Sequence, residues 1–170
     1  IEHAAAEKEH HELQEAERWA ELLGAYDRAI RMGTRPAEAW TGKGVAFKRL
    51  GRLEEAMKCQ DLALKLDAES EIAWCNKGDL YFHMGQLERA IESYDKALVI
   101  RPKYAIAWNN KGAALARAGR YEGARRCHDR AVALKPKYVA AWLNRGEVLA
   151  RLGEAEEAAR CLERARALGA

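Results

Sequence analysis

The chain has 170 residues, of which 49% are hydrophobic and 32% are charged, and its 29 basic and 26 acidic residues leave a formal net charge of +3. Because the two signs are nearly balanced, the composition argues against nucleic acid or an anionic membrane as the partner. No apolar run approaches the roughly 20 residues that a membrane-spanning helix needs.

The first 36 residues fit the pattern of the rest of the chain only in their second half. Tyr26 aligns with Tyr94 two periods later, but Ala6 and His10 fall where later copies have a tryptophan and a glycine. We expect residues 1–36 to be a degenerate first repeat or a set of polar N-terminal capping helices, which repeat arrays need at their ends. The segment also begins as a helix already under way, so we expect a fragment of a longer protein.

From residue 37 onward the sequence repeats itself at a constant interval. The recurring positions are Trp40, Trp74, Trp108 and Trp142, then Gly44, Gly78, Gly112 and Gly146, and then Gly51, Gly85, Gly119 and Gly153. A period of about 34 residues is typical of a stacked array in which each repeat is too short to bury its apolar face alone. The sequence therefore predicts one continuous all-α solenoid over residues 37–170.

Each of the four repeats reads as two helices with a turn between them. The repeats cover 37–70, 71–104, 105–138 and 139–170. First helices are expected at about 37–50, 71–84, 105–118 and 139–152, and second helices at about 54–67, 88–100, 122–134 and 156–168. Gly85 and its equivalents should end the first helices in the left-handed conformation. Pro102 and Pro136 mark turns, because proline cannot continue a helix interior.

The glycine in the middle of each first helix predicts a close approach between helices. Trp74, Gly78 and Tyr81 share one helix face, and a glycine inside a helix costs about 1 kcal/mol relative to alanine. Ala90 and Ala97 of the second helix offer only methyl groups. We expect the two helices to touch at the glycine, with the tryptophan packing over the gap.

These residues carry a clear resemblance to a known repeat. The frame Trp74, Gly78, Tyr81, Gly85, Ala90, Tyr94, Ala97 and Pro102 resembles the tetratricopeptide repeat, strongly over 37–170 and weakly over 3–36. The resemblance implies an α-α superhelix of antiparallel helix pairs. It also implies a non-enzymatic protein-interaction scaffold, whose first helices line a concave groove for an extended peptide or a partner helix.

The chain departs from the repeat pattern in two places. Basic residues replace the usual leucine before the packing glycine, namely Lys43, Lys77, Lys111 and Arg145. We expect their stems to cover apolar surface while their charges reach water. The aromatic positions also change in later copies, where Leu115 and Leu149 replace Tyr81, and His128 and Leu162 replace Tyr94. These changes should loosen the packing locally.

Helical periodicity places two rows of polar residues on the predicted groove face. The asparagine row is Asn76, Asn110 and Asn144, with Gly42 at its start, and the basic row is Arg49, His83, Arg117 and Arg151. Further candidates are Asp79 and Asn109, with Ile72, Cys75, Phe82, Ile106 and Glu147. Asparagine amides can bond the backbone of an extended chain, and arginines favour carboxylates, so we expect an acidic or mixed-polarity peptide partner. The alternative is that the asparagines bond only neighbouring carbonyls or water.

The clamp of Lys, Asn, Asn, Lys and Arg that chaperone-binding members of the family use for a C-terminal carboxylate does not match this chain. Only Asn76 fits; the other positions hold Thr41, Val45, Ile106 and Asn110, or Glu7 and His11 one repeat earlier. Binding of an Hsp70 or Hsp90 tail is therefore not expected. The asparagine row is more similar to that of the superhelical arm of the O-linked GlcNAc transferases. A substrate-recognition arm of a larger enzyme, or a scaffold that self-assembles through its ends, stays an alternative.

Other chemistry is sparse. His3 and His10 share one helix face, with His11 beside them, but no thiol or carboxylate completes a zinc set, so we expect no metal or other cofactor. The sequence has no catalytic triad, phosphate-binding loop or CxxC pair, which argues against an enzyme.

The cysteines and the last helix give two further expectations. Cys59, Cys127 and Cys161 occupy one repeat position, where successive helices should hold them beyond the roughly 7 Å Cα limit for a disulfide. Free thiols favour a reducing, cytoplasmic compartment. In the last helix an apolar stripe of Ala158, Leu162, Ala165 and Leu168 lacks a covering helix, and we expect it to contact more of the chain or a second copy.

Overall fold

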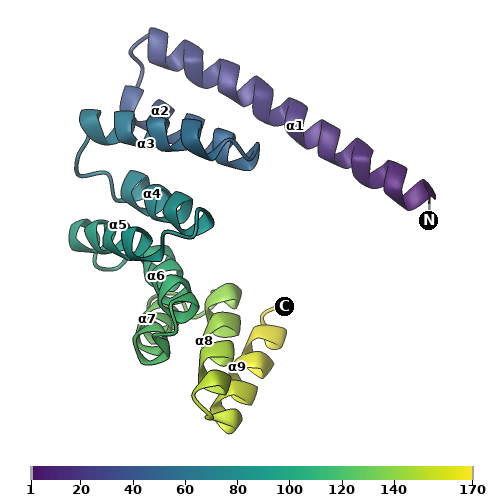
Figure 1. Ribbon diagram of the computed structural model, residues 1–170, viewed down its shortest axis with the longest axis vertical. Helices are drawn as coiled ribbons and strands as arrows, with labels where there is room; N and C mark the ends of the chain where they lie inside the picture. Colours follow the sequence, from purple (N-terminus) through teal and green to yellow (C-terminus); the bar gives the residue numbers. More distant parts are fainter. Residues whose placement is uncertain (1, 170) are drawn as a thin grey trace. The chain divides into compact units, whose positions relative to one another are not determined.

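In a computed structural model, residues 2–169 are described, with side chains described at 14, 15 and 17–169. These residues form nine α-helices and no strand (Figure 1), which confirms the all-α prediction. The helices are α1 (Glu2–Arg31), α2 (Pro36–Arg49), α3 (Leu53–Leu66), α4 (Glu71–His83), α5 (Leu87–Ile100), α6 (Ala105–Arg117), α7 (Tyr121–Leu134), α8 (Val139–Arg151) and α9 (Ala155–Ala167). From α2 onward every helix end lies within one residue of its predicted position. None of the described helices is long and apolar enough to cross a membrane.

The chain divides into two compact units, residues 1–76 and 77–170, with the break inside α4. In the first unit α1 packs on α2, and α2 packs on α3. The segment predicted as a degenerate repeat or cap is one helix of 30 residues (Figure 1). The ring of Tyr26 on α1 occupies the space that a Cβ at Gly42 would need, 2.5 Å from that position. The asparagine row therefore starts with a glycine because α1 leaves no room for a side chain there.

In the second unit each helix packs on the next along the chain. The hairpins α6–α7 and α8–α9 are joined by packing of α7 on α8 and by contacts between α6 and α8, and α5 packs on α6. The contact surfaces between the helices are rich in alanine. Those that are fully buried include Ala107, Ala114, Ala124, Ala131 and Ala141. Small side chains let helix backbones approach closely, as the repeat pattern predicts.

The turn inside each repeat ends the first helix as predicted. At Gly85 the backbone has φ 75°, a left-handed conformation that glycine adopts without strain. The next N–H, of Gln86, donates to the carbonyl of Tyr81 at 2.9 Å, which satisfies a carbonyl in the last turn of α4.

The packing glycines lie under a side chain of the second helix of the same repeat. A Cβ at Gly78 would lie 2.6 Å from the Tyr94 ring, and a Cβ at Gly112 would lie 2.6 Å from the His128 ring. At Gly78 and Gly112 this ring fills the space that the tryptophan was expected to cover. At Gly146, by contrast, Trp142 packs against Ala158 and Cys161, which face the glycine, as predicted.

The tryptophans also close the seam between consecutive hairpins. Trp108 and Trp142 pack against the buried cluster of Ala131, Val132 and Ala141. Each indole also donates a hydrogen bond from Nε1 to the carbonyl of the proline in the preceding turn, Pro102 and Pro136 respectively. The tryptophans are thus core residues, as predicted, and they also hold the turn that precedes their helix.

Basic residues before the packing glycines form ion pairs with the preceding helix, which corrects the expectation that their charges reach water. Nζ of Lys111 lies 2.5 Å from Oδ1 of Asp95, and Nε of Arg145 lies 2.6 Å from Oδ1 of Asp129. In the first unit Lys43 pairs with Asp27 at 2.6 Å. The spacing along the chain is the same in each pair, because an aspartate follows the Tyr94 position in every copy involved.

The last helix is less exposed than the sequence predicts. Ala158 and Ala165 are buried, and α9 packs on α8, so the uncovered stripe is limited to Leu162, which is 42% exposed, and the half-buried Leu168. The expectation of a fully uncovered stripe was wrong because the alanines face α8. Self-association through α9 stays a prediction that rests on these two leucines.

Replacing Gly78 with alanine should destabilise the fold although alanine is the better helix former. The new methyl would meet the buried Tyr94 ring at 2.6 Å, and overpacking of this kind costs about 1–3 kcal/mol. Gly123→Ala is the matched control, since its Cβ would meet only Leu115 at 3.4 Å, and it should be neutral or stabilising by about 0.5–1 kcal/mol. Urea unfolding measures both; equal effects of the two changes would contradict the close contact.

Candidate functional site

Two cavities open at equivalent positions of successive repeats in the second unit. The smaller has a volume of about 170 Å³ and is lined by α4, α5 and α6; the larger has about 340 Å³ and is lined by α6, α7 and α8. Ala113 on α6 lines both, so the cavities are neighbours on either side of that helix. Both lie beside members of the two rows of polar residues predicted from the sequence.

The smaller cavity is closed at its base by hydrogen bonds to Asp79. Oδ1 of this carboxylate accepts from the Tyr94 hydroxyl at 2.7 Å and from Nδ2 of Asn110 at 2.9 Å. Phe82 and His83 complete the lining from the end of α4, and Nδ1 of His83 donates to the carbonyl of Asp79 at 2.7 Å. Two predicted residues, Asp79 and Asn110, are thus brought together, but they bond each other.

The larger cavity arises because three side chains are smaller or shorter than their counterparts one repeat earlier. One repeat period after Asp79, Phe82 and Tyr94 of the smaller cavity, the larger cavity has Ala113, Ala116 and His128, respectively. These three replacements leave more room in the larger cavity, whereas Arg117 and Glu147 are larger than their counterparts His83 and Ala113.

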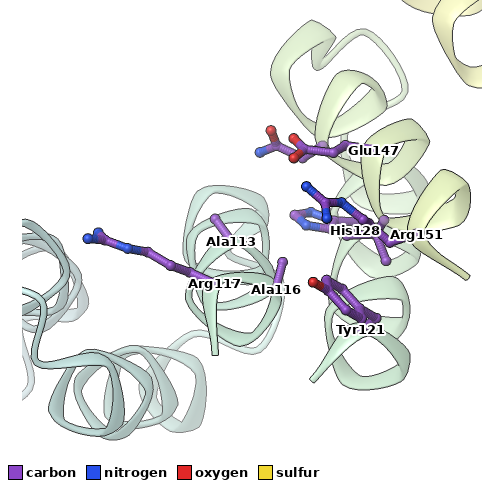
Figure 2. Close-up of a pocket in the computed structure, with 9 residues that line it drawn as sticks. Ala113, Ala116, Arg117, Tyr121, His128, Glu147 and Arg151 are labelled. Atoms are coloured by element: carbon purple, nitrogen blue, oxygen red, sulfur yellow. The ribbon is translucent and has the colours of Figure 1, made fainter. Parts of the chain in front are cut away.

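Polar side chains from α7 and α8 line the larger cavity. Figure 2 shows His128, Arg151 and Tyr121 gathered around it, with Glu147 further along α8. Asn144 also lines the cavity and donates from Nδ2 to Oδ1 of Asn109 at 3.0 Å. The predicted residues Asn144 and Arg151 therefore reach one cavity, together with a carboxylate and a buried imidazole.

His128 lies at the bottom of this cavity and is fully buried. Its Nδ1 is 3.2 Å from Oδ1 of Asn109, whereas its Nε2 is buried without a hydrogen-bond partner. Burial lowers the pKa of His128 from 6.5 to about 4, because the charged imidazolium is poorly solvated there. The imidazole is therefore neutral near pH 7.

Arg117 belongs to the predicted basic row, but its guanidinium contacts Phe82 on the neighbouring helix α4. Its Nη1 donates to the carbonyl of Phe82 at 3.2 Å, and the guanidinium lies over the Phe82 ring at 5.1 Å from its centre. Figure 2 shows the side chain extending away from the other residues of the larger cavity. A cation at the last turn of α4 is favourable, because helix C-termini carry partial negative charge.

The remaining predicted residues are spread over both units. Arg49 is exposed and lies over the Trp19 ring, 6.0 Å from its centre, and Asn76 is half-buried on α4. Cys75 and Asn109 are buried, at 3% and 5% exposure, so the expectation that they line the groove surface was wrong. Position 109 faces α7 and α8, where its amide bonds His128 and Asn144.

The residues of the larger cavity that sequence reasoning missed are Ala113, Ala116, Tyr121, His128 and Val148. His128 was noted only as a departure from the tyrosine of the repeat. The signal in the sequence was that residues 113, 116 and 128 of one repeat are all smaller than the residues one period earlier, at 79, 82 and 94.

The cysteines are buried thiols rather than disulfide partners at all four positions, Cys59, Cys75, Cys127 and Cys161. Burial raises the pKa of the Cys59 and Cys127 thiols, so both are unreactive near neutral pH. Among the described residues no group of three or more His, Cys, Asp or Glu could hold a metal ion. The side chains of His3, His10 and His11 lie outside the described residues.

Comparison with family models decides the class of protein. A model described as "TPR repeat" matches residues 78–119 and again 114–153, and a model described as "Tetratricopeptide repeat" matches residues 37–70. The chain belongs to the tetratricopeptide repeat family. The repeat matches support the coarser prediction from the sequence, that the chain is a protein-interaction scaffold.

Solved structures show the same fold in a distant relative. A crystal structure of MamA superposes with a TM-score of 0.74 at 20% identity, covering 86% of this chain and 85% of that one. MamA from residue 41 to its end, from Desulfovibrio magneticus RS-1, gives a TM-score of 0.71 at 20% identity, with 91% and 94% covered. A search of curated protein sequences gave no match.

The buried His128 should make this tetratricopeptide protein less stable in mild acid. Its folded pKa of about 4 lies below the ordinary 6.5, so the unfolded chain binds the extra proton between these values. Stability should thus be full above pH 6.5 and fall as the pH drops toward 4. Between pH 7 and 4.5 the wild type should lose about 2–3 kcal/mol more than His128→Gln in urea unfolding. An equal loss in both proteins would show that His128 does not titrate this way.

Proposed function

We propose that the chain binds an extended peptide of mixed polarity along the face where its first helices carry the asparagine and basic rows. The observation that carries this proposal is the pair of neighbouring cavities at equivalent positions of successive repeats. An extended chain presents side chains at regular intervals, so a surface with one cavity per repeat suits it better than a compact ligand does.

The amides support binding to a peptide backbone. Asn144 donates one N–H to Asn109, which leaves its second N–H and its oxygen for a ligand. Asn110 donates one N–H to Asp79 and accepts a hydrogen bond from Asn109 through its oxygen. The internal bonds hold both amides in fixed orientations. A fixed amide loses little conformational entropy on binding, which favours affinity.

The charges support a mixed-polarity peptide rather than a strictly acidic one. Arg151 and Glu147 both line the larger cavity from α8, so each sign is present. Arg117 bonds a backbone carbonyl, and Asp79 accepts two hydrogen bonds within the chain. The charges that line the larger cavity therefore favour neither a strictly acidic nor a strictly basic ligand.

The test is a peptide array from the source proteome, probed with wild type and with a triple variant, Asn76→Ala, Asn110→Ala and Asn144→Ala. Because each lost hydrogen bond is worth about 0.5–1.5 kcal/mol, the triple variant should bind selected peptides at least about tenfold more weakly. The matched control is Arg126→Ala with Arg130→Ala, which changes two side chains of a separate cavity on α5, α6 and α7 and should leave binding unchanged.

Circular dichroism must show both variants folded, since Asn110 and Asn144 also make bonds inside the chain. Peptides retained equally by the triple variant would overturn the role of the asparagine row. Loss of binding in the control variant alone would move the binding surface to the cavity on α5, α6 and α7.

A further inference from the structure

The hydrogen bonds that run from the smaller cavity to the larger one share one direction, which determines the tautomer of His128. The Asp79 carboxylate can only accept, so Asn110 turns its Nδ2 toward it and its oxygen toward Asn109. Nδ2 of Asn109 then donates to that oxygen at 3.4 Å, which leaves Oδ1 of Asn109 facing His128 and Asn144. Asn109 must therefore accept from both of them.

With Asn109 in this orientation, the hydrogen bond between His128 and Asn109 requires the imidazole proton on Nδ1, which leaves a lone pair on Nε2. A neutral imidazole has one donor nitrogen and one acceptor nitrogen, and the donor is committed to Asn109. Nε2 is buried and has no partner, and the residue lines the cavity. A buried acceptor without a partner is rare in folded proteins, so the cavity is suited to a group that donates a hydrogen bond.

We propose that the larger cavity is a selectivity pocket for an uncharged ligand side chain ending in a hydrogen-bond donor, the amide of Asn or Gln or the hydroxyl of Ser or Thr. The proposal rests on the proposed peptide binding and names the side chain that the groove selects. The donor bonds Nε2 of His128, and the acceptor atom of the same side chain takes a hydrogen bond from Arg151 or Tyr121, which gather at the cavity (Figure 2).

Other side chains fit the cavity less well. A carboxylate has no proton to donate and would set its lone pairs against that of Nε2. A lysine or arginine would bring another cation close to Arg151, and this repulsion offsets its attraction to Glu147. An apolar side chain would displace water and leave Nε2 without a partner. Uncharged donors are the class that satisfies both the imidazole and the guanidinium.

The same position of the repeat in α3 shows a second example of a buried acceptor. Gln60 aligns with His128 and, like it, covers the packing glycine of its repeat. Its Nε2 donates to the carbonyl of Thr41, and its Oε1 is buried without a partner. The residues at this repeat position suggest two substitutions for His128. Glutamine, as at Gln60, keeps a hydrogen-bond acceptor, and leucine, as at Leu162, removes it.

The first experiment measures the imidazole directly. Long-range ¹H–¹⁵N spectra should show His128 protonated at Nδ1 at pH 7, and propionamide should shift its Nε2 resonance while propionate should not. Protonation at Nε2, no shift with propionamide, or an equal shift with both probes would overturn the proposal.

The second experiment is a positional-scanning peptide library probed with wild type, His128→Gln and His128→Leu. Wild type should enrich Asn, Gln, Ser or Thr over Asp, Glu, Lys and apolar residues by about tenfold at one position, because a polar site rejects ligands that leave it unpaired. His128→Gln should keep this preference, and His128→Leu should reduce it to about threefold or less while still binding peptides through the asparagines. Thermal unfolding confirms that both variants fold.

The outcomes separate the two proposals. Peptide binding without the preference, or with a preference unchanged in His128→Leu, overturns the selectivity pocket and leaves peptide binding intact. A library without any binder, combined with a propionamide shift at Nε2, overturns peptide binding and supports the pocket as a site for amides.

Discussion

In the repeats that contain Gly44, Gly78 and Gly112, the first helix makes a close contact with one large side chain on the second helix, and the rest of the structure depends on this constraint. No Cβ fits at Gly78 or Gly112, because the rings of Tyr94 and His128 lie there. The two helices of a repeat are thus held at a separation set by a glycine and the ring that covers it. The alanines of the seam and the tryptophans between hairpins pack around this fixed spacing.

The side chain that covers the glycine also reaches the cavity side of the helix pair. Tyr94 passes over Gly78 and ends in a hydroxyl bonded to Asp79, while His128 passes over Gly112 and ends in an acceptor at the larger cavity. The side chain at this repeat position therefore packs on the glycine and also contributes a polar group beside the cavity. Changing it alters the cavity without altering the helices, provided that the new side chain still fills the space above the glycine.

Periodicity was enough to predict the helices, their turns and the family, because these depend on residues recurring at a fixed spacing. The prediction of the site was less complete, since it treated every residue on a helix face as exposed. Asn109 and Cys75 share that face but are covered by neighbouring helices, and Arg117 bonds the carbonyl of Phe82. The cavity at His128 depends on side chains from three helices, and no single helix pattern contains that information.

The ion pairs between helices bear on how such a chain gains or loses whole repeats in evolution. Lys43, Lys111 and Arg145 each meet an aspartate at the same spacing along the chain, so the joint between one repeat and the next has the same chemistry at each of these places. A duplicated or excised unit of one repeat period would restore an intact joint on both sides. Chain length and cavity content can therefore evolve independently, and repeats with different cavities can be exchanged without redesigning their borders.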